Sequence, residues 1–181
     1  MTAYLQEMAA SFSHPVTAIA QILGFIPVFL GFFIFRNVSR RTSIAIKAVS
    51  DFISAVHFLL LNAATGCAIN FVNTARGICF AQKGKLAWAS GIWMPILFCI
   101  ATTVSTVIGW TGLLSLLPLV GSCLAVIGYW CSDPSHLRRF NFAGIFLWLI
   151  YGIIVFSLPT IVGNTISLIS IVKTELTVKR R

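Results

Sequence analysis

Charged side chains are scarce in this sequence. They make up 9% of its 181 residues, and only four of them are acidic. Soluble domains carry roughly 25% charged residues. The deficit is matched by a hydrophobic fraction of 58%, more than the core of one domain of this length could shield from water. These proportions exclude an ordinary soluble domain and predict an all-α integral membrane protein whose partner is the lipid bilayer.

Motifs for catalysis and for metal binding are absent as well. The sequence contains no HExxH motif, no GxSxG motif and no paired carboxylates. Its five cysteines show neither CxxC nor Cys/His ligand spacing, which argues against a metal site and against a disulfide framework. We therefore expect no enzyme activity, no catalytic residues, no metal and no cofactor.

Apolar runs are what the sequence has in abundance. A helix that spans the hydrocarbon layer needs about 17 to 25 mainly apolar residues. Seven runs come near this length, and Pro, Gly or charged residues separate them. We expect helices at about 15–35, 42–62, from the turn at 63–66 to 82, 86–108, 113–129, 137–156 and 159–173. The second and third helices, and the sixth and seventh, are joined by very short loops and must be antiparallel neighbours.

The basic residues indicate topology rather than a nucleic-acid partner. In a membrane protein Lys and Arg mark the cytoplasmic connections, so the net charge of +9 does not predict nucleic-acid binding. Twelve of the thirteen fall in the first-to-second, third-to-fourth and fifth-to-sixth connections, at their edges or in the C-terminal tail. The exception is Arg76, inside the third helix. This alternation predicts an outside N-terminus and an inside C-terminus.

A degenerate internal repeat relates the two halves of the chain. His57 and Asn73 are 16 positions apart, as are Trp148 and Asn164, and a shift of 91 residues relates the two pairs. An odd number of helices per repeat plus one linker makes the repeats parallel, related by an axis along the membrane normal. We expect one membrane domain, 1–181, in a 3+1+3 arrangement: repeat one at about 15–82, a linker helix at about 86–108 and repeat two at about 113–173.

Polar residues inside these helices allow two interpretations. They can line a pocket or water-filled path at membrane depth, or they can serve helix packing. The repeat favours a pocket for Asn73 and Asn164, whereas a lone histidine more often holds a helix contact and a tryptophan can fill a core. Asp51 and Arg76 lie at similar depths on adjacent helices, and a buried ion pair is the simplest account of them.

The same features resemble known transporter families. The 3+1+3 plan, with Pro27 and Pro118 in the first and fifth helices, resembles the SWEET and SemiSWEET sugar transporters of the PQ-loop/MtN3 group. AVHFLLLNAATGCAINFVNTAR and LRRFNFAGIFLWLIYG more closely resemble the bacterial YgjV-type inner membrane proteins. That resemblance implies a multi-pass protein of the bacterial inner (cytoplasmic) membrane. Mid-helix prolines can kink a helix or act as hinges for alternating access. The Pro-Gln dipeptide and the prolines of SWEET helices two and six are missing here.

The resemblance also implies a binding site. In SWEET proteins the Asn of the third helix of each repeat, and an aromatic residue on the preceding helix, contact the sugar. The matching positions are Asn73, Asn164, His57 and Trp148, which implies a mid-membrane pocket between the repeats for a small neutral, sugar-like solute. The alternative is a non-transporting scaffold or accessory protein, in which the polar stripes only join helices. The sequence leaves both open, as it does a homodimer.

Overall fold

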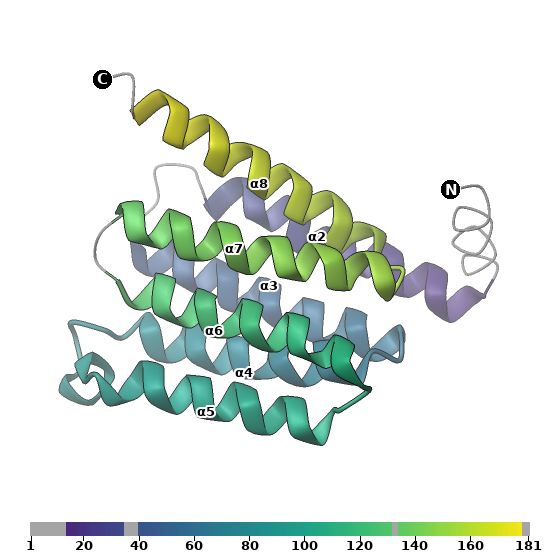
Figure 1. The fold of residues 1–181 in the computed structure, drawn as a ribbon, viewed down its shortest axis with the longest axis horizontal. Coiled ribbons are helices and arrows are strands. Elements are labelled where there is room, and N and C mark those ends of the chain that lie inside the picture. The colour runs from purple at the N-terminus through teal and green to yellow at the C-terminus, as the bar shows by residue number, and fades with distance from the viewer. Residues whose placement is uncertain (1–13, 35–39, 132–133, 179–181) are drawn as a thin grey trace.

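The computed structural model describes residues 14–34, 40–131 and 134–178, which form helices and no strands (Figure 1). Seven of the elements are α-helices: α2 (Pro15–Ile34), α3 (Arg40–Leu60), α4 (Ala64–Phe80), α5 (Trp93–Ile108), α6 (Leu116–Trp130), α7 (Pro134–Ile154) and α8 (Leu158–Val178). Two short 3-10 helices precede α5 and α6: η1 (Ala87–Ser90) and η2 (Leu113–Ser115). The prediction of an all-helical protein with seven long helices is therefore confirmed.

The fourth helix begins later than the sequence suggests. The apolar run from residue 86 predicts one continuous helix, but α5 begins only at Trp93. Gly91 has an extended backbone, with φ −74° and ψ 145°, and separates η1 from α5. An extended residue cannot take part in the helical hydrogen-bond ladder, so hydropathy alone places this boundary too early.

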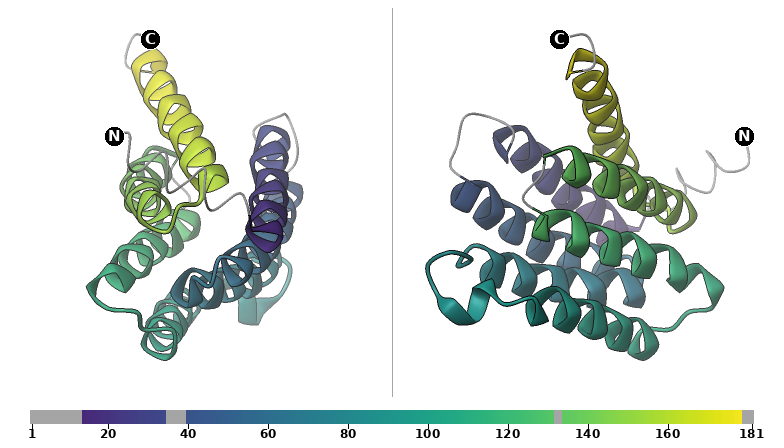
Figure 2. Two further views of the ribbon diagram at one scale, coloured as in Figure 1. Left: turned by 90° about the vertical axis from the view of Figure 1, so that its right-hand side faces the viewer. Right: turned by 60° about the vertical axis from the view of Figure 1, so that its left-hand side comes forward.

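The helices form a ring. Each one packs against the helices before and after it in the chain, and α2 packs against α8. Figure 2 shows this arrangement close to end-on in its left panel, and both of its panels show α8 leaning away from the other helices toward its C-terminal end. In addition, α4 contacts α6 across the ring. Residues on facing sides of α4 and α6 therefore lie inside the bundle.

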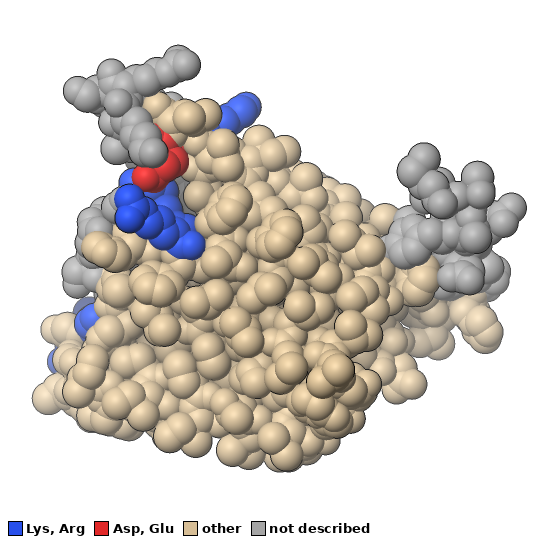
Figure 3. Space-filling view, viewed as in Figure 1, with Lys and Arg blue, Asp and Glu red and all other residues tan. Residues whose placement is uncertain are grey.

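Large apolar side chains cover the outside of the ring. Ile22 of α2 is 70% exposed and Ile108 of α5 is 80% exposed, and similar side chains follow along the other helices. A soluble monomer rarely leaves so much contiguous apolar surface exposed. Figure 3 shows a face almost without charge, with Lys, Arg, Asp and Glu gathered toward one end. This surface fits a lipid environment.

Hydropathy and length select two of the seven helices as candidate membrane spans. Among the described helices, only Leu113–Trp130 and His136–Ile154 are long and apolar enough to qualify by length and composition. Three more segments are apolar but shorter: Pro15–Gly31, Trp93–Ile108 and Leu158–Lys173. The remaining helices, α3 and α4, carry most of the polar residues that are buried inside the bundle, such as Asp51 and Arg76.

Basic residues hold the charged end of the bundle together. Lys83, after α4, donates a hydrogen bond to the carbonyl oxygen of Trp130 at 2.9 Å, and its Nζ lies 3.7 Å from the centroid of that ring. Arg138, near the start of α7, pairs with Glu175, near the end of α8, at 2.9 Å. These connections meet at one end of the bundle, the end that the positive-inside rule predicts to be cytoplasmic.

Two equivalent turns join α3 to α4 and α7 to α8. Asn62 and Phe156 adopt φ angles of 57° and 54°, the left-handed conformation of a Schellman helix end. In both turns the next residue donates its backbone N–H to the carbonyl five positions earlier, at 2.9 Å. The turns are 94 positions apart, three more than the shift that aligns the two prolines. In this register His57 corresponds to Tyr151, and Asn164 corresponds to Asn70 rather than to Asn73.

The two expected hinge prolines occupy different positions. Pro27 lies inside α2, as the sequence suggests. Pro118 is the third residue of α6 rather than a mid-helix residue. The first turn of a helix tolerates proline because its N–H groups have no intrahelical partners. Of these two prolines, Pro27 is therefore the one in a helix interior.

Candidate functional site

A layer of polar residues lies between two apolar clusters. The outer apolar cluster, near the turns after α3 and α7, is built on buried Phe58, Ala63, Cys67 and Tyr151, with Leu61, Leu117, Trp148 and Val155 packed against it. The inner apolar cluster, toward the charged end, contains Ile44, Phe80, Ala89, Met94, Phe98 and Val126. Asp51 of α3, Asn73 and Arg76 of α4, and Ser122 of α6 are buried at intermediate positions along their helices. We call these four residues the polar layer.

Ser122 joins the two halves of the chain in this layer. Its hydroxyl oxygen accepts hydrogen bonds from Asn73 Nδ2 at 3.4 Å and from Trp148 Nε1 at 3.2 Å. Ser122 is fully buried. Two of the expected site residues, one from each half of the chain, are therefore brought together through a serine that sequence reasoning missed. Its only signal in the sequence is a small polar residue after Gly121 in an apolar run.

Two glycines allow α6 and α7 to approach closely enough for Trp148 to contact Ser122. A Cβ atom on Gly121 of α6 would lie 2.9 Å from the carbonyl oxygen of Gly144 and 2.9 Å from Trp148 Cδ1. A Cβ atom on Gly144 of α7 would lie 2.7 Å from the carbonyl oxygen of Gly121. The two backbones thus approach closely, as small residues allow between membrane helices. This contact brings the indole of Trp148 beside Ser122.

The ring of Trp148 belongs to the outer apolar cluster. Its centroid lies 5.8 Å from that of Phe58 and 5.7 Å from that of Tyr151, the latter in an edge-to-face arrangement. The indole N–H points to the polar layer through Ser122. Trp148 therefore lies at the boundary between the outer apolar cluster and the polar layer.

His57 lies near the end of α3 rather than at the middle of that helix. It is three residues before the end of α3, about 4.5 Å by helical rise. Its Nδ1 lies 2.7 Å from the carbonyl oxygen of Ala20, and its Nε2 lies 2.7 Å from Ser157 Oγ. A carbonyl only accepts, so Nδ1 carries the proton in this arrangement. Both ring nitrogens thus have protein partners, and His57 joins α2, α3 and the start of α8.

Tyr151, the equivalent of His57 in the turn register, makes the reciprocal contact. Its hydroxyl oxygen accepts a hydrogen bond from the backbone N–H of Gly66 at 3.1 Å. Gly66 is in the first turn of α4, where backbone N–H groups have no partner within the helix. His57 from the first half holds the start of α8, and Tyr151 from the second half holds the start of α4. We call this pair of contacts the outer clamp.

Asn164 is the expected site residue that the described contacts leave apart. It lies half-buried on α8, and within the described ranges no hydrogen bond joins it to Asn73, His57 or Trp148. Asn70, its equivalent in the turn register, donates to the Gly66 carbonyl of its own helix at 2.8 Å. Asn70 therefore has a local packing role.

The charges of the polar layer are only loosely paired. Arg76 Nη2 lies 3.9 Å from Asp51 Oδ2, and both side chains are 4% exposed. Asp51 Oδ1 is also bound by Lys47, whose side chain is 34% exposed. Because 3.9 Å exceeds hydrogen-bond range, Asp51 has its closer partner in Lys47.

Among the described residues, three buried side-chain polar atoms have no hydrogen-bond partner. They are Asp51 Oδ2, Asn73 Oδ1 and Arg76 Nη1, all in the polar layer. Such an atom costs about 1–3 kcal/mol when it stays unpaired, and buried polar groups are rarely left so. The layer therefore offers one free donor and two free acceptors to water or to a ligand with hydroxyl groups.

Comparison with protein families assigns the chain. Residues 18–181 match the Imp-YgjV family, described as a bacterial inner membrane protein. The chain belongs to this family. Membership and the helical bundle together make it a multi-pass protein of the bacterial inner membrane, as the resemblance in the sequence implied. Neither the curated proteins nor the solved structures gave a match.

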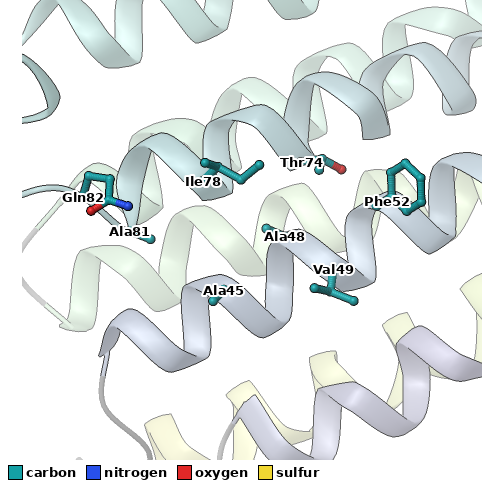
Figure 4. A pocket seen from close by; sticks show the side chains of 8 residues that line it. All are labelled: Ala45, Ala48, Val49, Phe52, Thr74, Ile78, Ala81 and Gln82. Carbon is teal, nitrogen blue, oxygen red and sulfur yellow. The ribbon is translucent and has the colours of Figure 1, made fainter.

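A separate groove lies on the outward-facing surface of the ring of helices in this YgjV-family protein. It has a volume of about 440 Å³ and lies between α3 and α4 (Figure 4). Its lining is mostly small or apolar: Ala45, Ala48, Val49, Phe52, Thr74, Ile78, Ala81 and Gln82. No residue of the polar layer lines this groove, so it is a different feature of the bundle.

Metal-binding groups are not part of either feature. In the part of the chain that the structure describes, no three His, Cys, Asp or Glu side chains are grouped closely enough to hold a metal ion. All five cysteines are free. The chemistry available in the polar layer of the YgjV-family bundle is hydrogen bonding, ring contact and charge.

Proposed function

We propose that this YgjV-family protein carries a small polar, sugar-like solute across the inner membrane by alternating access. The observation that supports the proposal is the polar layer, with its three unpartnered atoms, enclosed between two apolar clusters. A carrier needs a hydrogen-bonding site near the middle of the membrane and an apolar barrier on each side of it. In this proposal the structure represents a closed state.

The chemistry of the layer suits a polyhydroxylated solute. Asn73 offers both a donor and an acceptor, and Ser122 offers a hydroxyl that can do either. The ring of Trp148 can stack on a sugar face. In the proposed cycle the solute replaces the Asn73–Ser122 and Trp148–Ser122 hydrogen bonds with its own hydroxyl groups.

The proposal assigns different roles to the other expected residues. His57 belongs to the outer clamp, which has to release α8 before the site opens outward. Pro27 provides the one helix interruption that could act as a hinge. Asn164 lies half-buried on α8, and it would reach the solute only if α8 moves toward the polar layer during the cycle.

Counterflow in proteoliposomes tests the proposal. A thermal-shift screen of the purified protein over sugars and small metabolites first selects the solute. Asn73→Ala and Ser122→Ala should abolish its exchange while the protein still folds, and Asn164→Ala should weaken it. Asn70→Ala is the matched control, because Asn70 is equally buried on the same helix but bonds its own helix. Equal exchange by the Asn73 and Asn70 variants would refute the proposed site.

The groove between α3 and α4 favours a second candidate, a scaffold that binds another helix. Small side chains such as Ala45 and Ala48 let a neighbouring helix approach closely, as between two copies of this chain. Filling the groove with Ala45→Leu, at an exposed position of its lining, should then dissociate a complex that cross-linking in the native membrane detects. A non-enzymatic role without cofactor or nucleic acid is part of both candidates.

A further inference from the structure

The polar layer and its immediate edge contain more positive than negative charge. Arg76 is buried in the layer, Lys47 is at its edge, and Asp51 is the one carboxylate that the structure places against either of them. Burying an uncompensated cation in the membrane is costly, and such residues usually mark a functional path. Among the residues that the structure describes, this group therefore carries one more positive than negative charge, which an acidic ligand would balance.

We infer that the solute bears one carboxylate and that Arg76 binds it. The inference rests on the proposed function, because it names the class of solute that the same site accepts. It replaces the neutral solute expected from the sequence with a small hydroxy acid or sugar acid.

The donor geometry of Arg76 supports this assignment. Nη1 is buried without a partner, and Nη2 lies 3.9 Å from Asp51 Oδ2, beyond hydrogen-bond range. A guanidinium presents its N–H groups as a planar fork that matches a carboxylate in two parallel hydrogen bonds. The Arg76 Cζ atom lies 5.3 Å from the centroid of the Tyr129 ring, so one face of the fork already rests on an aromatic side chain. The unpartnered Nη1 end of the fork is suited to an acid.

The hydroxyl-binding groups lie next to this fork. Asn73 and Arg76 are three residues apart on α4, so their side chains share one face of the helix. On α6, Ser122 contacts Asn73 and Tyr129 contacts Arg76, seven residues or about 10 Å further along. A solute that lies between α4 and α6 can place its acid at Arg76 and its hydroxyls at Asn73 and Ser122.

In this inference Asp51 competes with the carboxylate of the solute for binding to Arg76. Its Oδ1 is bound by Lys47, so Asp51 keeps a partner when Arg76 turns to the solute. Removing the carboxylate of Asp51 should leave Arg76 entirely to an external acid. A purely structural ion pair predicts the opposite, because its loss would only damage the fold.

Binding to the full-length protein in nanodiscs tests the inference. The probes are three acids and their neutral counterparts: glucuronate with glucose, gluconate with sorbitol, and lactate with propane-1,2-diol. At least one acid should bind about ten- to hundredfold more tightly than its counterpart, as expected for hydrogen bonds to a charged group. Arg76→Gln should lose this preference. Lys85→Gln, which removes the same charge from an exposed loop, should keep it.

Asp51→Asn keeps the inference testable even where Arg76→Gln does not fold. This variant should bind the preferred acid more tightly than the wild type, and the acid should restore its thermal stability. No preference for any acid in the wild type, or weaker acid binding by Asp51→Asn, would overturn the inference. If the neutral probes exchange in the counterflow assay but no acid is preferred, the carrier proposal stands without this inference. Acid binding without exchange would instead refute the carrier.

Discussion

The hydroxyl of Tyr151 gives the sharpest structural prediction. Tyr151→Phe removes a single oxygen atom and keeps the ring that packs against Phe58 and Trp148. The lost oxygen accepts the Gly66 N–H at 3.1 Å, and both residues are buried. That N–H has no alternative partner within α4 because it belongs to the first turn.

The expected loss follows from this stranded donor. A buried polar group that loses its partner costs about 1–3 kcal/mol. No cavity forms beyond the volume of the oxygen, so the lost hydrogen bond should account for nearly the whole effect. Unfolding of the purified protein in mixed micelles should show this decrease in stability, and the Gly66 amide should exchange its hydrogen faster.

Tyr129→Phe is the matched control. The described contact of Tyr129 is between its ring and Arg76, and phenylalanine keeps that ring. This variant should change stability by less than about 0.5 kcal/mol. Equal stabilities of the two variants, or unchanged exchange at Gly66, would mean that the outer clamp does not hold α4.

Three further predictions concern topology, charge and packing. Reporters fused in the turns after α3 and α7 should face outside, and those after α4 and at the C-terminus inside; an outside C-terminus would contradict the alternation of charge. Asp51→Asn should cost about 3–5 kcal/mol in the unfolding assay, because it strands a buried cation. Arg76→Gln should cost less, because Lys47 still pairs with Asp51, and the double variant should lose less than the sum; strict additivity would mean that the two residues are independent. Gly121→Ala should cost about 1–3 kcal/mol by overpacking α6 against α7, whereas Gly31→Ala, whose Cβ would meet nothing within 4 Å, should not.

The helices were largely predictable because proline, glycine or charged residues mark many of their boundaries. Proline opens the first helix at residue 15, and charged residues mark three of the six connections between helices. The exception is α5, since the extended backbone at Gly91 has no hydropathy signal. The ring order of the helices depends on side-chain packing across the bundle, and single-helix patterns do not encode it.

The candidate site was predictable only in part. Asn73 and Trp148 stand out as polar or bulky residues at matched spacing, and both contact Ser122. In the sequence, Ser122 cannot be told apart from a residue such as Thr103. The hydroxyl of Thr103 donates to the Cys99 carbonyl of its own helix. Only the packing of α4, α6 and α7 distinguishes the two.

The turns and the prolines relate the two halves of the chain by different shifts, 94 and 91 residues. Phe156 adopts the left-handed conformation, which is rare for a bulky residue, so the sequence predicts a turn before Pro159 but does not show which residue adopts that conformation. The resulting three-residue difference is close to one helical turn and changes which residues correspond. His57 is thereby matched with Tyr151 in the outer clamp instead of with Trp148.

The most direct test of the carrier proposal is access to the polar layer from each side of the membrane. A protein with its five native cysteines replaced would carry Ser122→Cys, and a membrane-impermeant thiol reagent would be applied to oriented vesicles from one side at a time. Lys85→Cys, in an exposed loop, reports the inside face alone. Alternating access predicts that Ser122→Cys reacts from both sides and that the solute slows the reaction. A thiol that reacts from neither side would contradict the carrier and leave the scaffold.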